Sequence, residues 1–117
     1  MALYNSTMEL VDTHCHLDVE EFDHDRDQVL QRTRACGVTR MVMPRVDADR
    51  WPGLLQLCER EDSLYPALRL HPVYLGQHRK QDIEVLAELL AQHRPVAVGE
   101  IGLDFFVPDL DREQQQQ

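Results

Sequence analysis

Two histidines separated by a single residue are the first feature of this sequence that could do chemistry. His14 and His16 follow a short apolar run, within the segment 12–18. If that segment continues a strand, the two imidazoles share a face and lie about 6.6 Å apart along the chain. Both could then reach one metal ion at about 2.0–2.1 Å, while Cys15 points to the opposite face and packs there. The alternative is two exposed histidines that stand near a turn.

Carboxylates flank these histidines and recur far along the chain. Asp12 and Asp18 share the histidine face in this interpretation, so either could accept the second ring N–H of a ligating histidine. Glu100 stands in the segment 98–104, Val-Gly-Glu-Ile-Gly-Leu-Asp, directly after an apolar run. A carboxylate at the carboxyl end of a strand occupies the place where parallel α/β folds build their sites. Two histidines and one glutamate would form an open metal site, whereas a glutamate in a loop is otherwise simply solvated.

His71 is the third candidate, in the sequence Leu-His-Pro after another apolar run. A histidine before proline is also compatible with a purely structural role. The remaining histidines, His24, His78 and His93, fall in polar stretches beside predicted helices, and we interpret them as solvated surface residues.

The elements that must position these residues alternate between two hydrophobic patterns. Short apolar runs predict strands, and apolar residues three and four apart predict helices. The predicted strands are 10–11, 38–43, 64–70 and 96–98, and the predicted helices are 25–36, 49–61 and 82–92. Strands that alternate with helices of this length indicate right-handed crossovers and a parallel sheet. In such a sheet the three motifs end at one rim.

Several boundaries follow from single residues. We expect Pro44 to end the second strand, and the continuous run Val96–Val98 to be covered on both faces of the sheet. Residues 1–8 are predicted to be a flexible leader. Residues 107–117 are predicted to form a loop and the start of an interrupted helix, because an acidic turn precedes the final glutamines.

Composition narrows the function classes. The 117 residues suit one domain, and 12 Lys and Arg against 21 Asp and Glu give a formal charge of −9. This charge argues against a protein that holds nucleic acid through a basic face, but not against an enzyme that meets phosphate through a bound cation. The three cysteines do not have the spacing of a zinc or redox motif, and we find neither a membrane span nor a signal peptide in the sequence. We therefore expect a cytoplasmic protein that is not bound to a membrane.

Together the three motifs resemble the TatD family of metal-dependent deoxyribonucleases. The resemblance implies a TIM-type (β/α)8 barrel that hydrolyses phosphodiester bonds of DNA with a metal-activated water. His14 and His16 match the ligands of the first strand, and Glu100 matches a carboxylate that can bridge two metals. His71 and Asp104 resemble rim residues with less defined roles. Zinc, manganese or magnesium would serve, and two histidines favour a borderline metal over magnesium alone.

The chain departs from the family pattern in two respects. Arg69 stands where the family usually has glycine, two residues before His71. We expect it either to crowd the rim or to change its charge. A (β/α)8 barrel needs about 250 residues, so this chain corresponds to the N-terminal half of such a protein. Its open sheet edges predict self-association and impaired activity. A non-catalytic interaction module, or a metal-dependent hydrolase of another ester or amide, stays open as an alternative.

Overall fold

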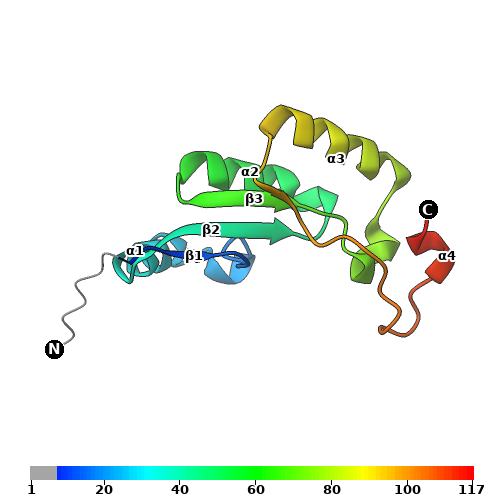
Figure 1. Cartoon of the computed structure of the whole chain (residues 1–117), viewed down its shortest axis with the longest axis horizontal. Helices are drawn as coiled ribbons and strands as arrows, with labels where there is room; N and C mark the ends of the chain where they lie inside the picture. Colours follow the sequence, from blue (N-terminus) through cyan, green and yellow to red (C-terminus); the bar gives the residue numbers. More distant parts are fainter. Residues whose placement is uncertain (1–7) are drawn as a thin grey trace.

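A four-stranded parallel sheet forms the centre of the molecule (Figure 1). The computed structural model describes residues 8–117, so residues 1–7 of the predicted leader lie outside the described part. The strands follow one another across the sheet in chain order, and they are β1 (Leu10–Asp12), β2 (Val38–Arg45), β3 (Leu64–Leu68) and β4 (Ala97–Val98). This arrangement confirms the prediction of a parallel sheet with helical crossovers.

Helices connect the strands at the positions that the hydrophobic pattern predicted, with ends shifted by one or two residues. The α-helices are α1 (Arg26–Ala35), α2 (Trp51–Arg60), α3 (Lys80–His93) and the short α4 (Arg112–Gln115). Three 3-10 helices precede or follow them, η1 (Glu20–Phe22), η2 (Ala48–Arg50) and η3 (Pro72–Gln77). None of the helices within residues 8–117 has the length and apolar character that a membrane crossing requires.

The hydrophobic core lies between the sheet and the helices α1 and α2. Met41 and Met43, two residues apart on β2, point to this side and are buried against Trp51 and Leu54 of α2 and Leu30 of α1. The residues between them face the other way, as the alternation of a strand requires. We call that other side the inner face. Its residues Val42, Pro44, Ala67 and Ala97 line a cavity of about 240 Å³ together with His14 and Glu100.

Two prolines stand inside strands, which corrects the prediction that Pro44 ends β2. Pro44 pairs with Ala67, and Pro66 of β3 pairs with Met43. The nitrogen of Pro44 faces the β1 side, because Val42 two residues earlier accepts a hydrogen bond from Cys15 there. β1 has already ended at that level, so the missing N–H interrupts no ladder. Pro66 faces the β4 side, and β4 begins pairing only at Ala67.

The expectation that the last strand is covered on both faces is wrong. β4 is only two residues long, and both of them are exposed. Val96 and Val98 keep 63% and 44% of their surface accessible. β4 is an edge strand that pairs only with β3 among the described residues, and its inner face meets the cavity rather than a packed layer.

The three cysteines differ in how they can react. Burial raises the pKa of Cys58 to about 12, and the nearby Asp18 and Cys15 add to the rise. Burial is also the main reason that the pKa of Cys15 is raised. Cys36 is exposed at the end of α1.

We therefore expect iodoacetamide at pH 8 to alkylate Cys36 first, because the thiolate is the reactive form and a raised pKa reduces its fraction. Cys15 and Cys58 should become labelled only in denaturant. Peptide mass spectrometry of the native and denatured protein measures this difference. Equal labelling of all three cysteines in the native state would contradict the burial described here.

Candidate metal site

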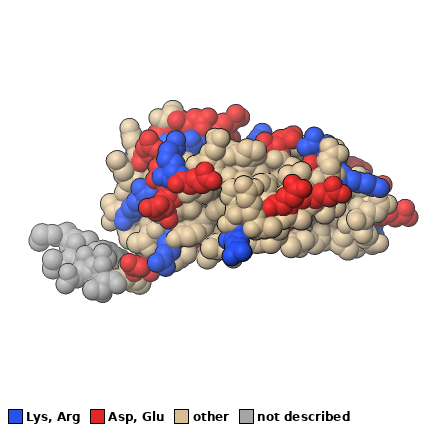
Figure 2. Space-filling view, turned by 90° about the horizontal axis from the view of Figure 1, so that it is seen from above, with Lys and Arg blue, Asp and Glu red and all other residues tan. Residues whose placement is uncertain are grey.

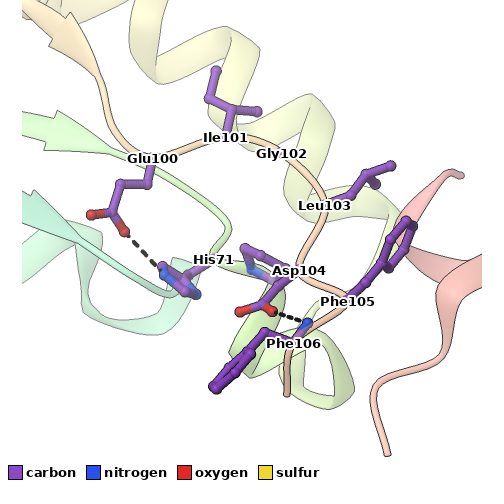
Figure 3. A pocket seen from close by; sticks show the side chains of 9 residues that line it. His71, Glu100, Ile101, Gly102, Leu103, Asp104, Phe105 and Phe106 are labelled. Atoms are coloured by element: carbon purple, nitrogen blue, oxygen red, sulfur yellow. Dashed lines mark hydrogen bonds and ion pairs between the residues drawn. The ribbon is translucent and has the colours of Figure 1, made fainter. Parts of the chain in front are cut away.

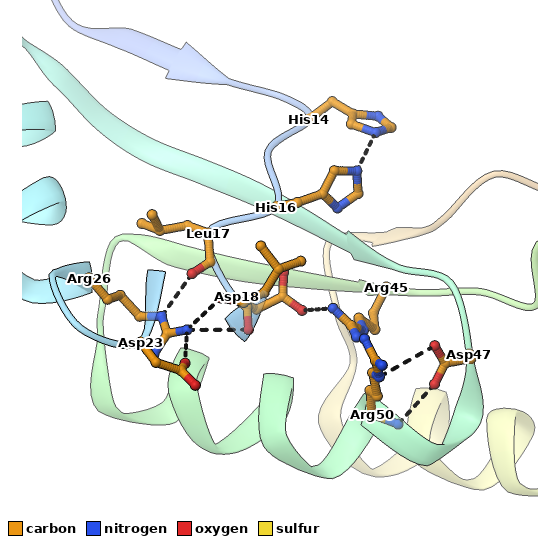
Figure 4. A network of polar contacts seen from close by, with 10 residues as sticks. His14, His16, Leu17, Asp18, Asp23, Arg26, Arg45, Asp47 and Arg50 are labelled. Atoms are coloured by element: carbon orange, nitrogen blue, oxygen red, sulfur yellow. Dashed lines mark hydrogen bonds and ion pairs between the residues drawn. The ribbon is translucent and has the colours of Figure 1, made fainter. Parts of the chain in front are cut away.

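His14 lies in a bend and His16 in irregular backbone, not in a strand, which corrects the geometry expected from alternation. β1 ends at Asp12, whose Oδ1 accepts a hydrogen bond of 3.0 Å from the backbone N–H of His14. This local bond bends the chain at His14, although the backbone N–H of Cys15 still donates to the carbonyl of Val42 on β2. The two imidazoles then approach edge to face, with their Nε2 atoms 3.2 Å apart (Figure 4). Asp12 therefore shapes the backbone of the bend.

The distance between the two Nε2 atoms can be compared with the geometry of a metal centre. Two nitrogens that bind one tetrahedral Zn²⁺ at about 2.0–2.1 Å are separated by about 3.3 Å. The observed Nε2–Nε2 distance of 3.2 Å matches this separation, so the pair could hold an ion without a large rearrangement. The His14 ring is about half exposed, which leaves a route for an ion and water.

Two arginines, one partly and one almost fully buried, fix the loop that carries these histidines (Figure 4). Arg26, at the start of α1, donates from Nε to the carbonyl of Leu17 at 2.8 Å and from Nη2 to the carbonyl of Val19 at 3.0 Å. Arg45, at the end of β2, donates to Asp18 Oδ2 at 2.8 Å, and both of these side chains are almost fully buried. Asp18 is thus held by Arg45 and is not the orienting partner of a histidine that the sequence suggested.

Glu100 reaches the same rim from the end of β4 and meets three cationic or titratable side chains. Its Oε1 lies 3.8 Å from His14 Nδ1, and its Oε2 lies 3.0 Å from His71 Nε2 (Figure 3). Oε2 also contacts Nη1 of Arg69. The half-exposed carboxylate therefore links the first, third and fourth strand ends.

The hydrogen bonds of His71 determine which of its ring nitrogens carries the proton. The backbone N–H of Val73 donates to Nδ1 at 3.1 Å, so Nδ1 acts as an acceptor. In the neutral ring the proton then lies on Nε2, which points at Glu100. His78, expected to be a solvated surface residue, is partly buried instead, and its Nε2 lies 2.7 Å from the carbonyl of His71. Nothing in the sequence pattern indicates this contact.

Asp104 organises the loop beyond Glu100. Its Oδ1 accepts hydrogen bonds from the backbone N–H groups of Phe106 and Val107, and Gln115 bonds the backbone of Asp104 on both sides. A cavity of about 340 Å³ opens between this loop and His71 (Figure 3). Asp104 therefore lies at the site entrance, where it holds backbone.

The structure brings most of the predicted site residues to one rim, but it does not form a complete metal cage. Within residues 8–117, no three side chains of the His, Cys, Asp or Glu type converge as ligands of one ion. Glu100 faces Nδ1 of His14, whereas the two histidines face each other through Nε2. The assignment of His14, His16 and Glu100 as metal ligands stays a prediction.

Comparison with known proteins decides the family. The model of the family described as TatD related DNase matches residues 11–117. The chain belongs to the TatD family. This confirms the resemblance carried by the three motifs of the rim.

Relatives in this family extend well beyond the present chain. The chain is 42% identical over 109 residues to the uncharacterized metal-dependent hydrolase YjjV of Escherichia coli, covering 91% of the chain and 42% of that protein. It is 33% identical over 105 residues to human deoxyribonuclease TATDN3, covering 82% of the chain and 38% of that protein. The chain thus spans about two fifths of the length of these TatD relatives.

The fold agrees with a solved TatD structure. The crystal structure of the TatD homologue YjjV superposes with a TM-score of 0.83 at 40% identity, covering 92% of this chain and 42% of that one. The four parallel strands and their helices match the N-terminal half of a TIM-type barrel, as the sequence predicted. In such barrels the carboxyl ends of the strands carry the site, which is where His14, His71 and Glu100 meet.

The ion pair between Asp18 and Arg45 yields a prediction about stability. Asp18→Ala should lower the free energy of unfolding by about 3–5 kcal/mol, because Arg45 would be left buried without its counter-charge. Asp49, which is exposed, provides a control, and Asp49→Ala should cost less than about 1 kcal/mol. Urea denaturation followed by circular dichroism measures both. A loss for Asp18→Ala no larger than that of the control would show that the pair does not hold the loop.

Proposed function

We propose that this chain carries the first part of a metal-dependent hydrolase site that cleaves phosphodiester bonds of DNA. The observation that carries the proposal is the pair of Nε2 atoms 3.2 Å apart at the rim where Glu100 and His71 also lie. Membership of the TatD family and the names of its relatives support the reaction class. Because the relatives are more than twice as long, turnover by this chain alone should be low.

The residues at the rim fit a divalent cation. His14 and His16 would hold it through Nε2, and two imidazoles favour zinc or manganese over magnesium alone. When bound, such an ion lowers the pKa of a coordinated water towards about 7 and polarises a phosphoryl oxygen. Glu100 stays the predicted third ligand, but its Oε1 faces Nδ1 of His14, so the carboxylate would have to turn towards the Nε2 side to complete the set.

The other groups at the rim orient rather than react. If both Nε2 atoms bind an ion, each ring carries its proton on Nδ1, and Nδ1 of His14 faces Glu100 Oε1. His71 presents its Nε2 proton to the other oxygen of the same carboxylate. The cavity beside His71 provides space for a substrate group.

The surface charge is consistent with DNA as a substrate and not as a tightly held partner. Acidic and basic side chains are interspersed over the face shown in Figure 2, and the chain carries a formal charge of −9. Binding of a phosphodiester would therefore depend on the charge of the bound cation.

The metal site is tested by titration and by activity together. We expect isothermal titration with Zn²⁺ or Mn²⁺ to show binding that His14→Ala and His16→Ala each weaken by at least about tenfold, because each removes one ligand. Glu100→Gln should also weaken it. His24→Ala is the matched control, because His24 is exposed and its ring contacts Asp25 rather than Glu100 or another histidine.

The variants that weaken metal binding should also reduce cleavage of single-stranded DNA in the presence of added metal, and the control variant should not. Cleavage that His14→Ala and His16→Ala leave unchanged would come from a contaminant and would count against the proposal. Cleavage of an aryl ester, with none of a phosphodiester, would favour the alternative that the substrate is another ester or amide.

A specific observation also favours a role in association. Exposed apolar side chains lie in β4 and on either side of it along the chain, and Phe106 is 96% exposed. They are Val96, Val98, Ile101, Leu103, Phe105 and Phe106. β1 and β4 are sheet edges in the described part of the chain. Apolar surface beside an unpaired edge is typical of a contact surface for another chain. We propose that this surface supports self-association, with or without catalysis.

We expect light scattering coupled to size exclusion to give a mass above 13.6 kDa that rises with concentration. Ile101→Asp with Phe106→Asp should lower this mass towards that of one chain, because the charges oppose burial of the surface. Val85→Asp on α3 is a control at another exposed apolar position. A monomer at all concentrations would rule out association.

Cytoplasmic localisation belongs to the same proposal. The three cysteines at positions 15, 36 and 58 are free, and this suits a reducing compartment.

A further inference from the structure

Arg69 is an arginine of the rim whose guanidinium contacts Glu100, the predicted third ligand of the proposed metal site. It follows β3 directly, and only 4% of its side chain is exposed. Its Nη1 contacts Oε2 of Glu100, the ion pair that the structure gives this guanidinium. An arginine stays protonated at every accessible pH, so a permanent positive charge stands against the carboxylate.

The positive charge of the Arg69 guanidinium is compensated by the carboxylate of Glu100. Nε and Nη1 of Arg69 are buried without an aligned hydrogen-bond partner, so the contact with Glu100 is an ion pair of opposite charges. A buried charge that loses its partner is strongly unfavourable. Movement of the Glu100 carboxylate away from Arg69 would therefore be energetically unfavourable.

Gly99 gives Arg69 the room to lie there. A Cβ atom at position 99 would come within 2.8 Å of the Cβ and Cδ atoms of Arg69. The aliphatic part of the arginine thus packs directly against the backbone of Gly99. This contact fixes the guanidinium beside the neighbouring residue, Glu100.

These contacts leave Glu100 with one oxygen for a metal ion. Oε2 is engaged by Arg69 and by His71, whose Nε2 lies 3.0 Å away. Oε1 faces His14 at 3.8 Å and has no closer polar partner among the contacts of the described residues. A carboxylate can bridge two cations, but the Oε2 side of Glu100 is already occupied by the positively charged guanidinium of Arg69.

We propose that Arg69 is a built-in cation that competes with divalent ions for Glu100 and limits the rim to one ion, held by His14 and His16. The inference rests on the proposed metal site. It makes Arg69 a residue that determines metal affinity and stoichiometry, acting through Glu100.

Zinc titration by calorimetry, with equilibrium dialysis to count bound metal, tests the proposal on the whole chain. The parent protein should bind one Zn²⁺. Arg69→Met should bind that ion about 10- to 100-fold more tightly, the range typical of groups that adjust a metal ligand, and the freed Oε2 should allow a second ion to bind. Methionine keeps an unbranched apolar stem against Gly99 but removes the charge. Adding Glu100→Gln to Arg69→Met should abolish the gain.

Arg60→Met is the matched control. It removes the same charge from an exposed position at the end of α2, where Arg60 lies near Glu61 and not near Glu100. Its zinc affinity should equal that of the parent. Circular dichroism of each variant verifies that it is folded before titration.

The outcomes separate this inference from the proposed function. An Arg69→Met affinity equal to that of the parent, with binding still lost in His16→Ala, would overturn the role of Arg69 and leave the metal site standing. Two ions bound to the parent would overturn it as well, whether or not the variants fold. No zinc binding by either the parent or Arg69→Met would overturn the inference together with the metal site.

Discussion

Parallel pairing of the four strands is the constraint on which the site depends. Arg45, Leu68 and Val98 stand side by side in the register of β2, β3 and β4, so the residues that follow each of them emerge at one level. Arg69, His71 and Glu100 come from these ends, and the bend after β1 adds His14 and His16. An antiparallel neighbour would send its carboxyl end to the opposite side of the sheet. The direction of the chain in each strand therefore decides which polar groups can meet.

Glu100 is the group in which these strand ends converge. Its two oxygens have different surroundings, since one meets Arg69 and His71 and the other faces His14. The proton on Nε2 of His71 is held there by the backbone N–H of Val73, so the ring adds a donor to the same carboxylate. Such an arrangement orients the carboxylate. In the proposed metal site, the charge of Arg69 would be part of what sets the metal affinity.

Arginine side chains contribute more to this rim than the acidic composition of the chain suggests. Arg26 donates hydrogen bonds to carbonyl groups of the loop between β1 and α1. Arg45, on the neighbouring strand, donates to the carboxylate of Asp18. These bonds fix the loop that carries His14 and His16. The sheet, by contrast, stays open along β4, where Val96 and Val98 are exposed. The rim is thus more tightly organised than the sheet edge below it, and this fits a chain that spans about two fifths of its relatives.

What the sequence by itself determined is the order of the elements and the rim to which His14, His16, His71 and Glu100 belong. Hydrophobic spacing is local, because it reflects which side of a strand or helix each residue presents, so it can be read directly from neighbouring residues. Only the tertiary structure decided that Pro44 and Pro66 lie inside strands, since that depends on where the adjacent strand ends. It also decided that Asp18 pairs with Arg45, that His78 supports His71 and that Arg69 holds Glu100. The pairs Asp18–Arg45 and Arg69–Glu100 each join residues from different strand ends. The partner of a charged side chain in such a pair depends on which residues lie nearby in space, and no local sequence pattern encodes this.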